Sequence, residues 1–149
     1  MSYVLTTQGF SPQIFASSVN SVAGTILNDS LVVPSQAKFG AGLPLRTLTG
    51  GVGADSLIFT FNLNGLGDSI WQGVSGWEYG FLVGGGYQNF TLGANAEAAF
   101  TGRVITLMGA STNGMNIDGS ALSALSVLKI VGGAGTDIIR GGAGLPWRV

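Results

Sequence analysis

Two glycine-rich segments that each end in an aspartate carry the residues best suited to ligand chemistry. Residues 50–58 and 132–140 share the pattern Gly-Gly-x-Gly-x-Asp-x-apolar-x, and a third copy begins at Gly141. Glycine lets the backbone turn its carbonyl oxygens inward, and calcium prefers six to eight oxygen ligands. The pattern therefore favours turns that offer carbonyl and carboxylate oxygens to a cation such as Ca²⁺.

These segments resemble the nonapeptide repeats of repeats-in-toxin (RTX) proteins, which are secreted or surface-layer-like bacterial proteins. The resemblance implies a parallel β-roll in which the glycine turns and their aspartates bind Ca²⁺. The metal ligands that it implies are Asp55 and Asp137, with the loop carbonyls of Gly51, Gly53, Gly133 and Gly135. The match is partial, because Asp55 has no tandem neighbour and the third copy has Pro146 and Arg148 in place of its aspartate and apolar residue.

A second candidate constellation is Asp68 and Glu78, which lie beside Trp71, Trp77 and Tyr79 within residues 67–79. Two carboxylates among aromatic side chains are typical of a glycosidase or a sugar-binding platform. The alternative is that the aromatic residues pack the core or form a subunit contact. The chain has only seven acidic residues, so we predict that it is not an enzyme. The residues assigned to a subunit contact are Trp71, Trp77, Tyr79 and Phe81.

The composition excludes several other kinds of chemistry. The 149 residues include no Cys and no His, which excludes disulfides, imidazole-bound metals and a Ser-His-Asp triad. Six basic and seven acidic residues give a net charge of −1 without the cationic stripe that nucleic-acid binding needs. No apolar run approaches the roughly 20 residues of a membrane-spanning helix, so we expect neither a nucleic-acid partner nor a membrane span.

Short strand-like segments between glycine turns must position these residues. Residues 25–27, 30–33, 56–61, 90–92, 103–107 and 128–131 are rich in β-branched or aromatic side chains and bounded by turn residues. Helix signals are confined to about residues 11–20 and one turn near residues 95–100. Residues 120–128 have a helical composition but lie between glycine turns, so they read equally well as strand.

The glycine turns recur along the chain at a spacing that predicts the architecture. They begin at Gly50, Gly84, Gly109 and Gly132, and the later spacings, near 24 residues, suit the coils of a β-solenoid. We predict a single all-β domain over residues 1–149, a β-solenoid or β-roll with glycine-rich corners and at most one or two short helices. The alternative is a β-sandwich or jelly roll. Residues 1–20 are predicted as an N-terminal arm, and residues 129–149 hold the RTX-like repeats.

The low charge and high apolar content of the chain indicate a surface that favours self-assembly. Charged residues make up 9% of the chain and the mean hydropathy is +0.45, so little charge repulsion opposes association. We predict a non-enzymatic structural protein that assembles with itself into a filament, surface layer or virion component. The alternative is a monomeric calcium- or carbohydrate-binding module. Because the first residues lack the features of a signal peptide, we expect a cell-surface or extracellular protein exported by another route, or a virion protein.

Overall fold

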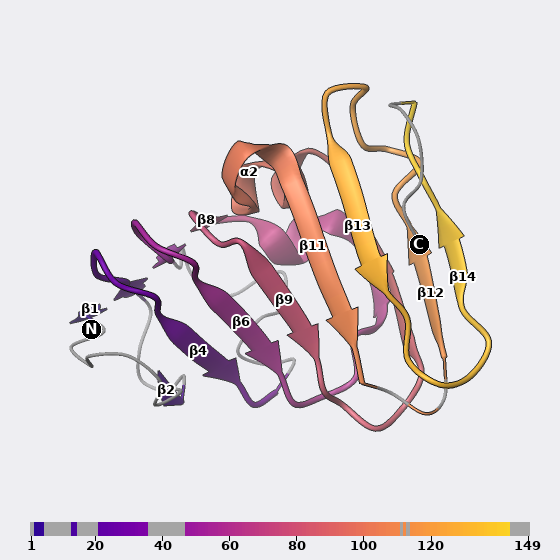
Figure 1. Ribbon diagram of the computed structural model, residues 1–149, viewed down its shortest axis with the longest axis horizontal. Helices are drawn as coiled ribbons and strands as arrows, with labels where there is room; N and C mark the ends of the chain where they lie inside the picture. Colours follow the sequence, from indigo (N-terminus) through magenta and orange to yellow (C-terminus); the bar gives the residue numbers. More distant parts are fainter. Residues whose placement is uncertain are drawn as a thin grey trace.

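Every pair of neighbouring strands among the described residues is parallel, and these strands form three sheets (Figure 1). The structure is a computed structural model that describes residues 2–4, 13–14, 21–35, 47–110, 112 and 114–143. Parallel neighbours cannot be joined by a tight hairpin. Here the chain returns to each sheet by passing through the other sides of a coil, which is the predicted β-solenoid.

The three sheets are named A, B and C in the order in which the chain meets them. Sheet A contains β1 (Ser2–Val4), β3 (Ser21–Ala23), β5 (Thr47–Thr49) and β8 (Val74–Ser75). Sheet B contains β2 (Gln13–Ile14), β4 (Ser30–Val33), β6 (Ser56–Phe59), β9 (Tyr79–Leu82), β11 (Val104–Gly109) and β13 (Val127–Val131). Sheet C contains β7 (Asn64–Leu66), β10 (Gln88–Thr91), β12 (Met115–Asp118) and β14 (Ile138–Arg140).

The register between neighbouring strands gives the length of each coil. From β3 onward, paired residues lie between 22 positions apart, as for Asn116 and Ile138, and 27 positions apart, as for Tyr79 and Thr106. The predicted spacing near 24 lies within this range. The coils are unequal because their corners differ in length, whereas the strands of sheet B stay aligned.

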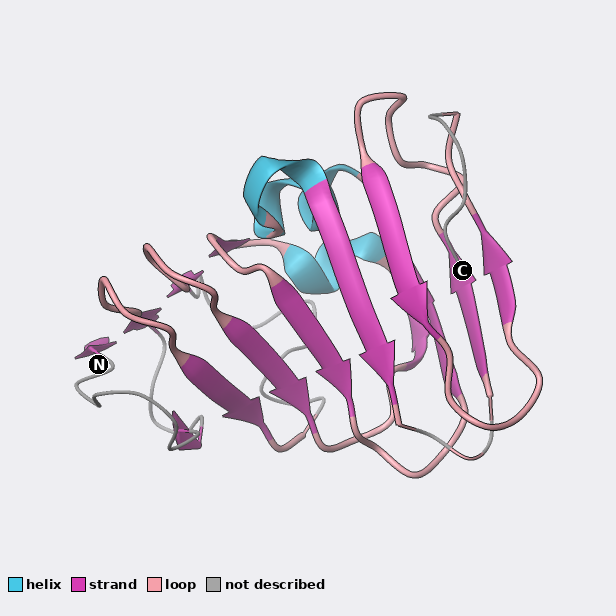
Figure 2. Cartoon of the chain, viewed as in Figure 1, coloured by secondary structure: helices cyan, strands magenta, loops and turns pink. Residues whose placement is uncertain are grey.

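The side of the coil that sheet A occupies changes along the chain. In the next coil after β8 this side is formed by the helix α2 (Ala94–Ala99) and the 3₁₀ turn η2 (Thr101–Arg103), and a second 3₁₀ turn, η1 (Asp68–Trp71), precedes β8. The helices lie together near the starts of the sheet B strands (Figure 2). The single turn predicted near residues 95–100 is therefore present as α2.

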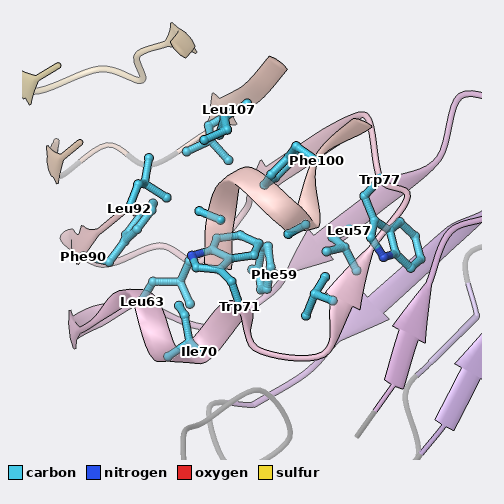
Figure 3. Packing of buried hydrophobic residues seen from close by; sticks show 14 of the residues in the cluster. Leu57, Phe59, Leu63, Ile70, Trp71, Trp77, Phe90, Leu92, Phe100 and Leu107 are labelled. Atoms are coloured by element: carbon cyan, nitrogen blue, oxygen red, sulfur yellow. The ribbon is translucent and has the colours of Figure 1, made fainter. Parts of the chain in front are cut away.

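The core fills the inside of the coil. Inward-facing residues alternate with outward-facing ones along β4, β6 and β9, and the inward ones are buried. Trp71 lies in the middle of this cluster with Phe59 and Phe100 beside it (Figure 3). Its ring centroid is 5.8 Å from that of Phe59 and 5.3 Å from that of Phe100. The apolar residues of the sequence thus divide into a dry interior and a set that points outward.

The structure differs from two local predictions and describes a third in part. Residues 25–27 form a bend rather than the predicted strand, because the Thr25 N–H and hydroxyl both donate to Asp29 Oδ2. Of the predicted N-terminal arm, residues 2–4 and 13–14 are edge strands paired with β3 and β4, and Gln13–Ile14 is strand where a helix was predicted. The rest of residues 1–20 lies outside the described residues. In the C-terminal repeats, β13 and β14 pair with β11 and β12, and residues 144–149 lie outside the described residues.

Candidate functional site

The outer face of sheet B carries a continuous apolar column. Strand register places outward-facing residues of β4, β6, β9, β11 and β13 side by side. These residues are Val32, Ile58, Phe81, Met108 and Val131. At about 4.8 Å between strands, the column is about 19 Å long. The neighbouring outward column is more polar and consists of Ser30, Ser56, Tyr79, Thr106 and Lys129.

The outer faces of sheets A and C differ in chemistry from that of sheet B. Sheet A presents small residues, namely Ser21, Ala23, Thr47, Thr49 and Ser75. Sheet C presents mainly polar residues, namely Asn64, Asn89, Asn116, Thr91, Asp118 and Arg140, with Ile138 as the apolar member. Among the described strands, the large apolar side chains that point outward are therefore concentrated on sheet B.

The aromatic residues assigned to a subunit contact are divided by the structure. Trp71 and Trp77 are completely buried, and Trp77 Nε1 donates to the Leu48 carbonyl oxygen at 3.0 Å. Tyr79 and Phe81 are half-buried on the outer face of sheet B, with ring centroids 6.4 Å apart. The two tryptophans therefore pack the core, whereas Tyr79 and Phe81 are placed where a second molecule can reach them.

Corner A–B, the turns that join sheet A strands to sheet B strands, contains a stack of three carboxylates. Asp29, Asp55 and Glu78 directly precede β4, β6 and β9 and occupy the same place in successive coils. Asp55 Oδ1 accepts the Asp29 N–H at 2.7 Å, and Glu78 Oε2 accepts the Asp55 N–H at 2.6 Å. Asp55 and Glu78 thus bind the backbone of the preceding coil, whereas Asp29 accepts the Thr25 N–H of its own turn.

Corner B–C, the turns that join sheet B strands to sheet C strands, repeats this arrangement with different residues. Gln88 Oε1 accepts the Leu63 N–H at 2.8 Å, and Asp137 Oδ1 accepts the Met115 N–H at 3.0 Å. The two Gly-Gly-x-Gly-x-Asp segments therefore give their aspartates the same local task at different corners. Asp55 lies at corner A–B and Asp137 at corner B–C, so the structure does not bring them together.

Glycine at corner A–B is required by the close stacking of the coils. Gly24, Gly50 and Gly76 follow β3, β5 and β8 in the same place of successive coils. A Cβ atom on Gly24 would overlap the Gly50 carbonyl oxygen, and one on Gly50 would overlap the Gly76 carbonyl oxygen. Gly51 and Gly53 in the same turn have φ angles of 111° and 146°, which side chains rarely tolerate.

Asp68 and Glu78, the carboxylates of the alternative enzymatic interpretation, both have structural partners. Asp68 accepts three backbone N–H groups at the start of α2, from Gly93 at 2.7 Å, Asn95 at 2.9 Å and Ala96 at 3.0 Å. These are N–H groups that a helix start leaves without intrahelical partners. Asp68 therefore caps α2, and Glu78 belongs to the corner A–B stack.

The remaining acidic residues bind backbone groups as well. Glu97 Oε1 accepts the Ser123 N–H, and Arg103 Nη1 lies 3.9 Å from Glu97 Oε2. Burial acts to raise the pKa of Glu97, but hydrogen bonds from Ser123 and Ser126 and the Arg103 charge bring it below its ordinary value. Asp118 accepts the Ser120 N–H at 2.9 Å, and the hydrogen bonds from Ser120 lower the Asp118 pKa.

All seven acidic residues of the chain thus accept a backbone N–H. No group of three or more His, Cys, Asp or Glu side chains in the described part of the chain is arranged to hold a metal ion. The predicted calcium ligands do not fit the tandem-loop site that the resemblance implies, because Asp55 and Asp137 lie at separate corners and each already faces an N–H donor. Sequence reasoning missed the roles of Asp29 and Glu97. The partner of Glu97, Ser123, lies 26 residues away, and the partner of Asp29, Thr25, lies in a bend where a strand was predicted.

Comparisons with known proteins identified no similar protein. No family model matches the chain, and neither curated proteins nor solved structures give a match. Among the described residues, no helix has the length and apolarity needed to cross a membrane. In the part of the chain that the structure describes, the fold defines the class of the protein as a parallel β-solenoid whose outer face on sheet B is apolar.

Proposed function

We propose that this protein is a non-enzymatic structural subunit that associates with copies of itself through the apolar column of sheet B. The single observation that carries the proposal is that column, which runs without interruption from Val32 to Val131. Val131 is 59% exposed, and apolar surface gathered on one side of a molecule is typical of an interaction site. The product would be a filament, a surface layer or part of a virion.

A second copy is the occupant best suited to this face. The net charge of −1 gives little long-range repulsion between copies. Among the described strands of sheet B, the charged residue next to the apolar column is Lys129. A second copy that places its own column against this one therefore meets mainly apolar side chains. The sequence has only thirteen formally charged residues for an accessible surface of 7466 Å², and two of them, Asp29 and Asp55, are buried, so few charges oppose contact between copies.

The strength of such a contact follows from the area that it buries. If each of the five side chains loses on the order of 40 Å² in both copies, burial contributes about 10 kcal/mol at roughly 25 cal/mol per Å². Association costs about 4–15 kcal/mol in lost freedom of motion. One pair of faces therefore binds weakly, and a stable assembly needs several contacts per subunit, as in a lattice or filament.

The non-enzymatic part of the proposal is supported by the use of the carboxylates. General acid–base catalysis or covalent catalysis by Asp or Glu needs a side chain within reach of a substrate. Here every carboxylate is bound to backbone, and the chain lacks Cys and His. The alternative of a monomeric calcium- or carbohydrate-binding module is an outcome of the test below.

The test compares Phe81→Glu with Thr91→Glu. Phe81 lies in the centre of the apolar column, whereas Thr91 is exposed on sheet C. We expect the wild-type protein and Thr91→Glu to form large particles at neutral pH in sedimentation velocity and electron micrographs, and Phe81→Glu to stay monomeric with unchanged circular dichroism. Wild-type protein that remains monomeric at high concentration with chelator would refute the proposal. A monomer whose stability rises with calcium, or that binds a glycan array, would favour the binding module.

A further inference from the structure

In sheet B, the outward side chains are arranged nearly symmetrically about β9. This strand lies in the middle of the five that carry the apolar column, with β4 and β6 on one side and β11 and β13 on the other (Figure 1). The column has a valine at each end, Ile58 and Met108 further in, and Phe81 at its centre. Among the described strands of sheet B, the outward aromatic side chains are Tyr79 and Phe81, both on β9. Aromatic anchors near the centre of a contact, surrounded by residues that exclude water, are typical of protein interfaces.

The outer face of sheet B differs in chemistry on the two sides of the apolar column. On one side lies the polar column, made of Ser30, Ser56, Tyr79, Thr106 and Lys129. On the other side, two residues after the apolar column, lies a third column made of Pro34, Thr60, Val83 and Ala110, all of them exposed. The backbone ladder continues to this third column, because the N–H groups of Thr60, Val83 and Ala110 each donate to the neighbouring strand at 2.9 to 3.3 Å. Apart from Thr60, its side chains offer no hydrogen-bonding group.

Two copies that bring their sheets B together are related by a two-fold axis in one of two directions, and each direction uses the same surface of both copies. An axis along β9 reverses the apolar column, so that Val32 of one copy lies opposite Val131 of the other and polar column meets polar column. An axis along the apolar column keeps its direction, so that Val131 lies opposite Val131 and the polar column meets the third column. Both directions keep the strands of the two sheets aligned, which is a common way for sheets to pack.

The polar column decides between the two axes. About an axis along β9, the opposed residues are Lys129 and Ser30, Ser56 and Thr106, and Tyr79 and Tyr79, so every polar side chain meets a hydrogen-bonding partner. About an axis along the column, Tyr79 lies opposite Val83 and Thr106 opposite Ala110. Their hydroxyl groups would lose water without gaining a partner, which is unfavourable. The axis along β9 also places the two Lys129 charges at opposite ends of the contact, about 19 Å apart.

We propose that sheet B binds a second copy of the chain across a two-fold axis that runs along β9, with the two apolar columns in opposite directions. Tyr79, Phe81 and Val83 of both copies then lie along the axis. Val83, which is 49% exposed in the single chain, is covered by its own counterpart. The inference rests on the proposed function, which takes a second copy as the partner of this face, and adds the orientation of that copy. Because the contact is symmetric, growth beyond a dimer uses other surfaces.

The test uses single cysteines, because the chain contains none of its own. Val32→Cys and a tagged Val131→Cys are mixed in equal amounts and treated with a short bismaleimide, which reaches across the roughly 10 Å between packed sheets. We expect the mixture to form cross-linked dimers at least about tenfold faster than Val131→Cys alone, because the contact raises the effective concentration of the two thiols. Tyr79→Cys should cross-link with itself. Phe81→Glu added to each protein should abolish both reactions, because it places two negative charges on the axis.

The outcomes separate this orientation from self-assembly itself. If Val131→Cys reacts faster with itself than with Val32→Cys, or if Tyr79→Cys reacts with Val83→Cys rather than with itself, the axis is wrong, although contact through sheet B stands. Particles that form without any of these cross-links would refute both the axis and the apolar column as the contact. A protein that stays monomeric at high concentration and gives no cross-link would refute the proposed function and this inference together.

Discussion

Replacing Asp68 by alanine tests whether this carboxylate is a structural cap. The side chain accepts three backbone N–H groups at the start of α2, at 2.7 to 3.0 Å. A hydrogen bond to a charged group contributes about 1.5–3 kcal/mol net, and a lost helix cap costs about 0.5–2 kcal/mol. Asp68 is half-buried, so water would replace part of what is lost. We therefore expect Asp68→Ala to lower the free energy of unfolding by about 2–4 kcal/mol, a large share of the usual 5–15 kcal/mol.

The measurement is urea unfolding near neutral pH, followed by tryptophan fluorescence, since Trp71 lies in η1 next to the cap. Asp68→Asn keeps one acceptor oxygen and should lose about half as much stability. Asp118→Ala is the control, because its hydrogen bond to Ser120 is exposed and spans two residues; it should cost less than about 1 kcal/mol. An Asp68→Ala protein within about 0.5 kcal/mol of wild type would refute the structural assignment, and loss of a hydrolytic activity at unchanged stability would restore the enzymatic one.

Two further predictions concern the coil corners and the acid limit of stability. Gly50→Ala should lower the free energy of unfolding by about 3 kcal/mol or prevent folding, because its Cβ would overlap the Gly76 carbonyl oxygen. The control is Gly85→Ala, whose Cβ would meet no atom within 4 Å, and this variant should unfold at nearly the wild-type urea concentration. Equal losses of stability in the two variants would contradict the stacking argument. Glu97 has a lowered pKa, so its contribution is present above the ordinary glutamate value of about 4.3 and is lost as the pH falls through the folded value. Denaturation midpoints of Glu97→Gln should therefore change less than those of wild type between about pH 7 and about pH 3, and parallel pH profiles would contradict this.

Much of the fold was predictable because it depends on local chemistry. The strands β4, β6, β11 and β13 lie where β-branched and aromatic residues are bounded by turn residues. The error at residues 25–27 has the same origin, since Thr25-Ile26-Leu27 has the composition of a strand. Its bend is stabilised by Asp29, four residues after Thr25, and composition alone does not reveal that contact.

The site was less predictable, because it depends on which coils are neighbours. Trp71 and Tyr79 are both aromatic residues of one segment, yet one fills the core and the other faces outward. The alternation of a strand separates its two faces but does not tell which face is inside for short strands near a turn. The apolar column is likewise formed by residues 23 to 27 positions apart, such as Ile58 and Phe81 or Phe81 and Met108.

Short β-strands with glycine corners, few charges and the lack of thiol and imidazole chemistry could be inferred from the amino acids alone, since these properties belong to individual residues and their nearest neighbours. The folded chain was needed to learn that Asp55 and Asp137, which end the same local motif, lie at different corners, and that the outer face of sheet B is apolar. Coils of unequal length must still align their strands. That alignment sets which side chains become neighbours, and no local pattern encodes it.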